Sequence, residues 1–346
     1  MATLKELSQM TGYSPATISR VLSGDRGLAV PVETRRRVLE AAGELNYAAT
    51  KSRRGRTPKR LFRVGLAEML APEQQLDDPY YLYLHTLVEQ ACLDSKLEPV
   101  FLPRRGEGFL PPADAPAEAL IAIGIFTPAE IDSLRAISPN LLFLDSSPEE
   151  TACDSVVINY RLGIGLALEY LRGLGHSRIA FVGPAEKLDD WKRPAPEERR
   201  RLYLEWMGRH GLPALLVDAP MDADHADRAV GRFLTARPQE RPTALLCANE
   251  ETAIGAQKAV RAFGLTIPGG MSLVSFNDTP LSQLQDPPLT SVSLHVREMA
   301  AAAVSLVRQR VVTADRPVAR TLAHKLVVPP TLVVRESTAP PADSTN

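Results

Sequence analysis

The stretch TGYSPATISRVLSG, residues 11–24, holds the signals for a sharp turn followed by a short helix. Gly12 ends the helical segment before it, and Ser14 with Pro15 begins the next, because serine caps helices and proline suits their first turn. From Ile18 onward apolar residues recur at helical spacing, which leaves small polar side chains and one arginine on the opposite face. Two short helices joined by a glycine turn are typical of a helix-turn-helix, whose second helix lies in the DNA major groove. An ordinary helical hairpin with a solvated arginine fits the same residues.

The segments on either side of this stretch complete a three-helix head. Upstream, Thr3 and Glu6 have the spacing of a capping box at the start of a helix. Downstream, residues 30–47 (VPVETRRRVLEAAGELNY) predict a third helix with one apolar stripe. We therefore expect a helix-turn-helix unit over residues 1–49, followed by a basic linker over residues 50–60.

Charge is distributed unevenly along the chain. Residues 1–60 carry twelve Lys and Arg against five Asp and Glu, a net charge of +7, whereas the rest of the chain carries a net charge of −8. A basic head on a mildly acidic body favours contact with phosphate groups. Because the positive charge coincides with the helix-turn-helix, we interpret the head as DNA-binding rather than as a merely solvated charged surface.

The composition is that of an ordinary soluble globular protein, with 45% hydrophobic and 23% charged residues. No apolar run reaches the length of a membrane span and the N-terminus lacks an export signal, so we expect a cytoplasmic protein. The cysteines Cys92, Cys153 and Cys247 are odd in number and far apart, which argues against a disulfide framework or a zinc site. No histidine has metal-ligand spacing and no nucleophile or phosphate-loop motif is present. We therefore expect no metal, no cofactor and no enzymatic activity.

Buried apolar strands alternate with amphipathic helices from residue 61 to residue 278. This alternation predicts an α/β core whose parallel sheets are covered by helices on both faces. The pattern occurs in two successive sets, which predicts two doubly wound parallel-sheet subdomains. Ligands of such sheets bind at the carboxyl ends of the strands, so we expect a binding crevice between the subdomains.

The order of these parts resembles the LacI/GalR family of bacterial repressors over nearly the whole chain. Three segments carry the resemblance: MATLKELSQMTGYSPATISRVLSG at residues 1–24, GIGLALEYLRGLGHSRIAFVGP at residues 163–184, and ALLCANEETAIGAQKAVRAFGLTIPGGMSLVSFNDTPLSQLQDPPLTSV at residues 244–292. Two further segments, LDDPYYLYLHTLVEQAC and PLTSVSLHVREM, look most like the galactoside-responsive members of the family.

The resemblance implies a core like that of periplasmic binding proteins behind the helix-turn-helix head. On this basis we assign the core N-subdomain to residues 61–159 and 292–322, the core C-subdomain to residues 160–291 and 323–336, and a disordered tail to residues 337–346. It also implies that His176, at a helix-to-strand turn, is a structural hydrogen-bonding residue rather than a catalytic base.

For DNA recognition, the resemblance gives each residue of the head a role. Arg20 matches the arginine that donates two hydrogen bonds to a guanine edge. Pro15 and Ala16 occupy the positions that tune operator choice, where an apolar side chain suits a thymine methyl group. The hydroxyl residues are expected to hold phosphates without reading sequence. The full expected set is Thr3, Ser14, Pro15, Ala16, Thr17, Ser19, Arg20, Thr34, Tyr47, Arg53 and Arg54.

The linker departs from the family pattern. Family members carry Tyr-x-Pro-Asn and then Ala-Arg-x-Leu, and their hinge helix inserts its leucine into the minor groove. Here Tyr47 is followed by Ala-Ala-Thr, and Arg-Gly-Arg at residues 54–56 occupies the region of the leucine. Arg53 and Arg54 offer minor-groove or phosphate electrostatics in its place. Whether a hinge helix forms stays open at this point.

For the ligand, the resemblance points to polar residues around the crevice. Asp145, Asn249 and Asn277 each end a strand, and their side chains offer donors and acceptors to sugar hydroxyls. Arg199 is selected as the first of three successive arginines, and a shift by one residue stays open. An aromatic ring is expected to stack on the apolar face of the sugar. The full expected set is Tyr80, Tyr81, Phe126, Asp145, Arg199, Trp206, Asn249 and Asn277.

Together these expectations describe a homodimeric transcriptional repressor of sugar-utilisation genes. Two heads would bind a pseudo-palindromic operator in double-stranded DNA, and galactose or a galactoside would release them. The helices within residues 81–92 and 296–311 are the expected dimer interface. The same fold with a purine-type corepressor, and a solute-binding module without DNA function, remain as alternatives. A sugar-handling enzyme would need paired carboxylates or a phosphate loop, and the sequence shows neither.

Overall fold

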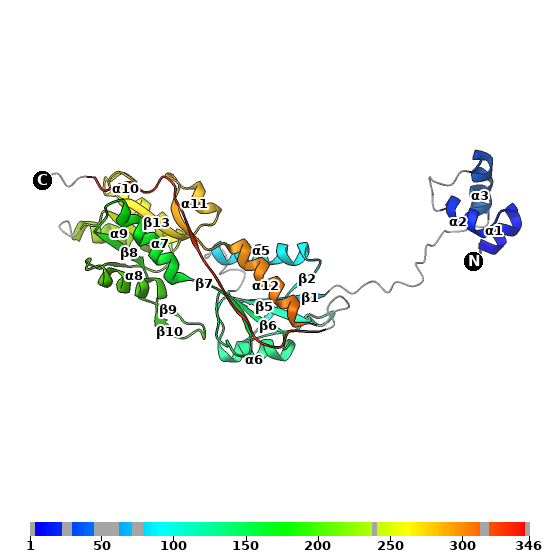
Figure 1. Ribbon diagram of the computed structural model, residues 1–346, viewed down its shortest axis with the longest axis horizontal. Helices are drawn as coiled ribbons and strands as arrows, with labels where there is room; N and C mark the ends of the chain where they lie inside the picture. Colours follow the sequence, from blue (N-terminus) through cyan, green and yellow to red (C-terminus); the bar gives the residue numbers. More distant parts are fainter. Residues whose placement is uncertain are drawn as a thin grey trace. The chain divides into compact units, whose positions relative to one another are not determined.

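The computed structural model describes residues 4–22, 30–44, 62–70, 79–236, 241–311 and 318–342. The chain divides into two compact units, residues 1–60 and residues 61–346, which are considered separately below (Figure 1). The expected linker over residues 50–60 and four expected DNA contacts lie outside the described residues. These contacts are Thr3, Tyr47, Arg53 and Arg54.

The first unit contains three short helices. They are α1 (Leu4–Thr11), α2 (Pro15–Leu22) and α3 (Val32–Glu44). The predicted turn is confirmed: Gly12 has a φ of 76°, and the Ser14 hydroxyl accepts a hydrogen bond from the Thr17 amide at 3.1 Å, which caps α2. A small apolar core joins the three helices, formed by Leu7, Ile18, Val21, Val38, Ala41 and Ala42.

The second unit contains two six-stranded sheets within its described residues. The first sheet has the order β15-β7-β6-β5-β1-β2, and every neighbouring pair is parallel. Its strands are β1 (Arg63–Glu68), β2 (Glu98–Phe101), β5 (Ala119–Ile123), β6 (Leu141–Leu144), β7 (Asp154–Ile158) and β15 (Lys325–Val328). Alternate strand residues pack against α5 (Pro79–Asp94) and α12 (Val296–Arg310) on one face and α6 (Pro128–Ile137) on the other. A short hairpin of β3 (Arg104–Arg105) and β4 (Gly108–Phe109) lies beside α6.

The second sheet has the order β11-β8-β12-β13-β14-β16. Its strands are β8 (Ile179–Gly183), β11 (Leu215–Asp218), β12 (Ala244–Cys247), β13 (Ser272–Asn277), β14 (Thr290–Ser293) and β16 (Thr331–Val333). One face packs on α7 (Tyr160–Gly173) and α8 (Glu198–Arg209), and the other on α9 (Ala223–Ala236) and α10 (Glu250–Ala262). The short helix α11 (Pro280–Leu284) follows β13, and β9 (Glu186–Leu188) with β10 (Pro194–Pro196) forms a separate hairpin.

The expected subdomain boundaries are wrong near the C-terminal end. β14 belongs entirely to the second sheet, so the return to the first subdomain follows residue 293 rather than residue 291. β15 pairs with β7 in the first sheet, although residues 323–336 were expected in the second. β16 runs antiparallel to β14, so the second sheet is not wholly parallel. In the sequence, the segment KLVVPPTLVV is a nearly continuous apolar run. Only the strand pairing in the structure shows that its two halves join different sheets.

The tail packs on the core through Ser337 and Ala339, which corrects the expectation of disorder for this part of it. The Ser337 side chain is fully buried, and its hydroxyl donates to the Leu273 carbonyl at 2.7 Å. His176 holds the next turn: its Nε2 donates to the Ala339 carbonyl at 2.9 Å, while Nδ1 lies 2.8 Å from the Thr243 hydroxyl. The structural role expected for His176 is confirmed.

Burial lowers the pKa of His176 below its ordinary value, against a smaller opposing effect of the Ala339 carbonyl. The unfolded chain therefore binds a proton more readily at this site, and the stability that His176 contributes is lost as pH falls below about 6.5, the ordinary histidine pKa. We expect the urea midpoint of the wild type to drop between about pH 7 and pH 5. The His176→Gln variant should show a smaller drop, whereas His225→Gln, at an exposed histidine, should follow the wild type. Equal drops in all three proteins would contradict this assignment.

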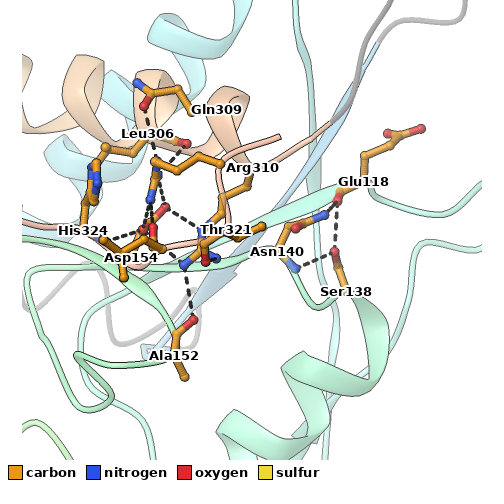
Figure 2. A network of polar contacts seen from close by, with 12 residues as sticks. Glu118, Ser138, Asn140, Ala152, Asp154, Leu306, Gln309, Arg310, Thr321 and His324 are labelled. Atoms are coloured by element: carbon orange, nitrogen blue, oxygen red, sulfur yellow. Dashed lines mark hydrogen bonds and ion pairs between the residues drawn. The ribbon is translucent and has the colours of Figure 1, made fainter. Parts of the chain in front are cut away.

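A cluster of charged side chains ties β7 to the end of α12. The Asp154 carboxylate is fully buried and lies 3.1 Å from Nε of Arg310 and 2.5 Å from Nη2 of Arg320 (Figure 2). It also accepts a hydrogen bond from the His324 amide at 2.7 Å. Because these partners lie far along the chain, Asp154 joins three segments at the edge of the first sheet.

Candidate functional site

The second helix of the head presents a polar face free of acidic residues. Ile18 and Val21 are buried in the head core, whereas the side chains on the other face are exposed. The expected DNA contacts with exposed side chains are Ser14, Pro15, Ala16, Ser19 and Arg20. Thr17 and Thr34 are half-buried. The Ser14 hydroxyl lies 2.9 Å from that of Thr17, so the cap places both hydroxyl groups at the start of α2, where a phosphate is favoured.

A cavity of about 310 Å³ lies in the second unit, lined by strand ends from the first sheet and by residues before and within α8. Of the expected ligand contacts, Tyr81, Asp145 and Arg199 line it. Asp145 directly follows β6, and Arg199 lies in the first turn of α8. This part of the cavity lies at the carboxyl end of a strand, where the ligand crevice is expected from the sequence.

Arg199 forms the buried floor of this cavity. Its Nε donates to the Glu197 carboxylate at 2.7 Å, and its Nη1 donates to the Ala248 carbonyl. Its guanidinium carbon lies 5.3 Å from the centroid of the Tyr160 ring. Burial opposes the charge, but the attraction of Glu197 outweighs it and raises the pKa of Arg199. A permanent, well-packed cation thus faces the ligand space.

The register of the three arginines follows from their partners. Arg200 pairs with Asp218 at the end of β11, and Arg201 lies near Glu198 and Glu205 on the surface of α8. Arg199 alone of the three is buried, with 4% of its surface exposed. The structure therefore places the first arginine in the cavity wall as a buried residue; Arg201 lines the same cavity from its exposed position, and Arg200 does not line it.

Asp145 and two tyrosines also line the cavity. The Tyr81 hydroxyl donates to Oδ2 of Asp145 at 3.0 Å. Tyr160 also lines the cavity, and burial followed by the nearby charge of Asp145 raises its pKa. Asp145 has a φ of 72°, in the left-handed region that Asp and Asn tolerate best, so the turn after β6 aims its side chain. Carboxylate, hydroxyl and guanidinium groups here suit a ligand with several hydroxyls.

Other expected ligand contacts have different roles in the structure. Phe126 is fully buried between Phe109 and Phe143, and Trp206 stacks on His210 with ring centroids 3.8 Å apart. Both rings are occupied by these neighbours, so the structure removes Phe126 and Trp206 from the expected ligand contacts.

The remaining three expected contacts pack beside the cavity wall. Tyr80 packs edge-on against Tyr81 at 5.1 Å. Asn249 caps α10, and its side-chain amide donates to the Met221 carbonyl at 3.2 Å. Asn277 ends β13 with 8% of its surface exposed and a φ of 99°. Asn249 and Asn277 keep their places at strand ends, where they remain candidates for ligand contact through a rearranged side chain.

Several residues of the cavity wall were not expected from the sequence. Tyr160 follows Asn159, the cap of α7, and its place after a strand was the available signal. The hairpin residues Lys187, Leu188, Asp189 and Asp190 also line the cavity, and they belong to the segment EKLDDWKRPAP, which lacks the periodicity of the core strands and helices. The Asp-Asp-Trp-Lys turn flanked by prolines would have indicated a hairpin.

Among the described residues, no group of three or more His, Cys, Asp or Glu side chains is placed to hold a metal ion. No helix in the same part of the chain has the length and apolar character needed to cross a bilayer.

Comparison with known families matches both units. Residues 3–49 match bacterial regulatory proteins of the lacI family, and residues 168–338 match the periplasmic binding protein-like domain. The chain carries a LacI-family helix-turn-helix domain and a periplasmic binding protein-like core. This confirms the resemblance and the fold class expected from the sequence.

Relatives of this chain include transcription regulators from several bacteria. The HTH-type transcriptional repressor MelR of Bacillus subtilis is 28% identical over 97% of both chains. GanR of the same organism is 27% identical over 97% of this chain and 99% of its own length, and GalR of Streptococcus thermophilus is 26% identical over 95% and 98%.

Solved structures share the fold of the chain. A lac repressor dimer bound to operator and the anti-inducer ONPF has a TM-score of 0.61 at 22% identity, covering 98% of this chain and 99% of its own. The CelR–cellobiose complex has a TM-score of 0.63 at 21% identity, covering 97% and 100%. An Arthrobacter LacI-family regulator in complex with lactose has a TM-score of 0.63 at 22% identity, covering 80% and 99%.

Proposed function

We propose that this protein is a cytoplasmic, homodimeric transcriptional repressor whose hold on operator DNA is released by a small sugar. The observation that carries the proposal is the union, in one chain, of a LacI-family head with an exposed polar α2 and a core with a polar cavity at strand ends. A ligand shifts such an equilibrium only by binding one arrangement of the core more tightly than another. We propose no catalytic role, in line with the relatives, which are transcription regulators.

The proposed DNA contacts follow the roles given to the head. Arg20 reads a guanine edge, Pro15 and Ala16 meet base methyl groups, and the hydroxyls of Ser14, Thr17, Ser19 and Thr34 position the head on phosphates. The exposed face of α2 supports this assignment. Thr3, Tyr47, Arg53 and Arg54 remain predictions from the sequence.

The proposed ligand is galactose or a galactoside. Asp145, Arg199 and Tyr81 offer an acceptor, a fixed cation and a hydroxyl around one cavity. The lactose bound to the Arthrobacter neighbour, a disaccharide that contains galactose, supports a galactose-containing ligand. A purine corepressor is the second candidate and would reverse the effect of the ligand on DNA binding.

The proposed dimer uses the outer faces of α5 and α12. The apolar residues of α12, among them Met299 and Val304, pack inside the chain against the first sheet and α5. The surface open to a partner is therefore the outward side of these helices, where Leu82 and Leu93 are exposed on α5. Paired cores would bring two heads to the two half-sites of one operator.

The function is tested by selecting bound fragments from random double-stranded DNA with the full-length protein. We expect a pseudo-palindromic site to emerge and to be retarded in a gel by the wild type. Adding galactose, lactose or melibiose in turn should release the DNA for one of them, while glucose and guanine serve as controls. If none of the sugars releases the DNA and guanine strengthens its retardation, the ligand acts as a corepressor and not as an inducer. Failure to select any site would contradict the DNA-binding function itself.

Asp145 provides a direct test of the ligand site. We expect Asp145→Asn to weaken binding of the inducing sugar by about tenfold or more, because a hydrogen bond to a charged group contributes about 1.5–3 kcal/mol. Asparagine keeps the left-handed backbone conformation, so the fold should survive. Calorimetric titration measures the affinity, and Asp132→Asn, at an exposed position on α6, is the matched control. Unchanged affinity in Asp145→Asn would remove this residue from the site.

A further inference from the structure

The hairpin β9–β10 stands apart from both large sheets. It is inserted between β8 and α8 of the second subdomain and forms a two-stranded sheet of its own. Its strand residues are mostly exposed. Contacts of its turn, rather than pairing with a large sheet, therefore fix its position.

One side chain organises the turn of this hairpin. Oδ1 of Asp189 accepts hydrogen bonds from the amides of Trp191 and Arg193, both at 2.9 Å. Oδ2 of the same carboxylate binds Nη2 of Arg193 at 2.8 Å. Lys192 takes a φ of 59° at the tip. The turn is therefore a defined structure that presents Trp191 and Lys192 outward from the second subdomain.

The tip contacts the first subdomain. Nζ of Lys192 lies 3.2 Å and 3.4 Å from the two carboxylate oxygens of Glu130 in the first turn of α6. Glu130 is 4% exposed and is held by Arg104 at 2.7 Å and by the Thr127 amide, also at 2.7 Å. The acceptor for Lys192 is thus a rigid, buried carboxylate.

Two more contacts join the same surfaces. The Trp191 side chain packs on the apolar cluster beneath α6, which contains residues of the first subdomain such as Phe109 and Ile131. The Asp190 carboxylate approaches the loop after β6, where burial raises its pKa and the Ser147 backbone lowers it by a smaller amount. An ion pair and an apolar contact therefore connect the hairpin to a subdomain to which it does not belong, and Asp190 approaches the same subdomain.

The inner side of the hairpin faces the ligand cavity. Lys187, Leu188, Asp189 and Asp190 from its first half and Ala195 and Pro196 from its second half all line the space. We propose that the β9–β10 hairpin is a lid of the ligand cavity, held shut by the docking of Trp191 and Lys192 on the first subdomain, and that its Asp190 binds the ligand. The ligand part of this inference rests on the proposed function.

The charges around the cavity indicate the class of ligand. The described residues that line it include five carboxylates, Asp145, Asp189, Asp190, Glu197 and Glu198, against three cations, Lys187, Arg199 and Arg201; Asp189 is in addition paired with Arg193 outside the lining. Water solvates the partly buried Asp190 carboxylate incompletely, and this raises its pKa. A hydrogen bond from a ligand hydroxyl would therefore stabilise the charged carboxylate. An anionic ligand would meet this excess of negative charge at close range. The lid therefore selects a neutral polyol over a sugar acid or a sugar phosphate.

The lid is tested first without any ligand, by hydrogen exchange on the full-length protein. We expect Lys192→Met to speed exchange of the hairpin amides by roughly fivefold or more, because opening becomes easier when the tip loses its ion pair. Lys258→Met is the matched control, since Lys258 pairs with Asp227 at an exposed site of the second subdomain. Exchange unchanged by Lys192→Met would overturn the lid.

Ligand selection is tested by calorimetric titration with galactose, lactose, galacturonate and galactose 6-phosphate. We expect the wild type to bind a neutral sugar at least about tenfold more tightly than its acidic counterpart, and Asp190→Asn to reduce that ratio. Equal binding of neutral and acidic sugars, or an Asp190→Asn variant with unchanged ratio, would overturn the role of Asp190. If the wild type binds none of the four, the proposed galactose-type ligand fails, and the exchange result still decides whether the hairpin is a lid.

Discussion

Replacing Arg20 by alanine is expected to abolish retardation of the selected operator at concentrations where the wild type binds fully. A bidentate arginine–guanine contact contributes about 1–3 kcal/mol, and a dimer makes two of them, so affinity should fall by roughly 30-fold to 20,000-fold. Arg20 lies on the exposed face of α2, away from the apolar core of the head, so the fold should be unaffected. Competition retardation with the selected site measures the loss.

Two controls separate base reading from simple loss of charge. Arg36→Ala removes a cation from the same head, but Arg36 is paired with Glu33 at 2.7 Å and Glu40 at 3.2 Å on α3. We expect this variant to lose little affinity. Sugar binding measured by calorimetry should be the same in the wild type and in Arg20→Ala, because the ligand cavity lies in the other unit. An Arg20→Ala protein that still retards the selected site fully would show that α2 reads DNA by other residues.

Removing the charge of Asp154 is expected to give the largest loss of stability among single substitutions in the core. In Asp154→Asn, the guanidinium groups of Arg310 and Arg320 lose the buried carboxylate that pairs them. Breaking a buried ion pair from one side costs about 3–5 kcal/mol, because the partner charge remains without compensation. Urea unfolding followed by circular dichroism gives the free energy of unfolding. Glu150→Gln is the control, since Glu150 forms an exposed pair with Lys325, and such pairs contribute about 1 kcal/mol or less.

The same carboxylate predicts a dependence on acid. Burial would raise the pKa of Asp154, but hydrogen bonds from Arg320 and Arg310 outweigh it and hold the pKa below its ordinary value. The stability from this pair is therefore present above the ordinary aspartate pKa, about 3.9, and is lost as pH falls further. The wild type should lose more stability than Asp154→Asn over that acidic range. A variant as stable as the wild type at neutral pH would show that Asp154 does not hold these segments together.

Local sequence signals determined the head of this protein. Gly12, Ser14 and Pro15 act through hydrogen bonds and backbone preferences within a few residues, so the turn and the start of α2 follow from neighbours in the chain. The alternation of strands and helices in the core is equally local, because helical and strand periodicity repeat within short windows. The strand ends then place Asp145 in the crevice, and the family pattern selects Arg199.

Tertiary structure decided the features whose partners lie far apart in sequence. Ile125 lines the cavity while its neighbour Phe126 is buried in the core, and only the packed sheet shows which of two adjacent side chains faces the ligand. Asp154 meets Arg320 across 166 positions, and Lys192 meets Glu130 across 62. Periodicity carries no information about such pairs, because their geometry exists only after the sheets and helices have packed. For that reason the family fold could be inferred from the sequence. The hairpin lid, the place of β15 in the first sheet and the full wall of the ligand cavity could be recognised only in the structure.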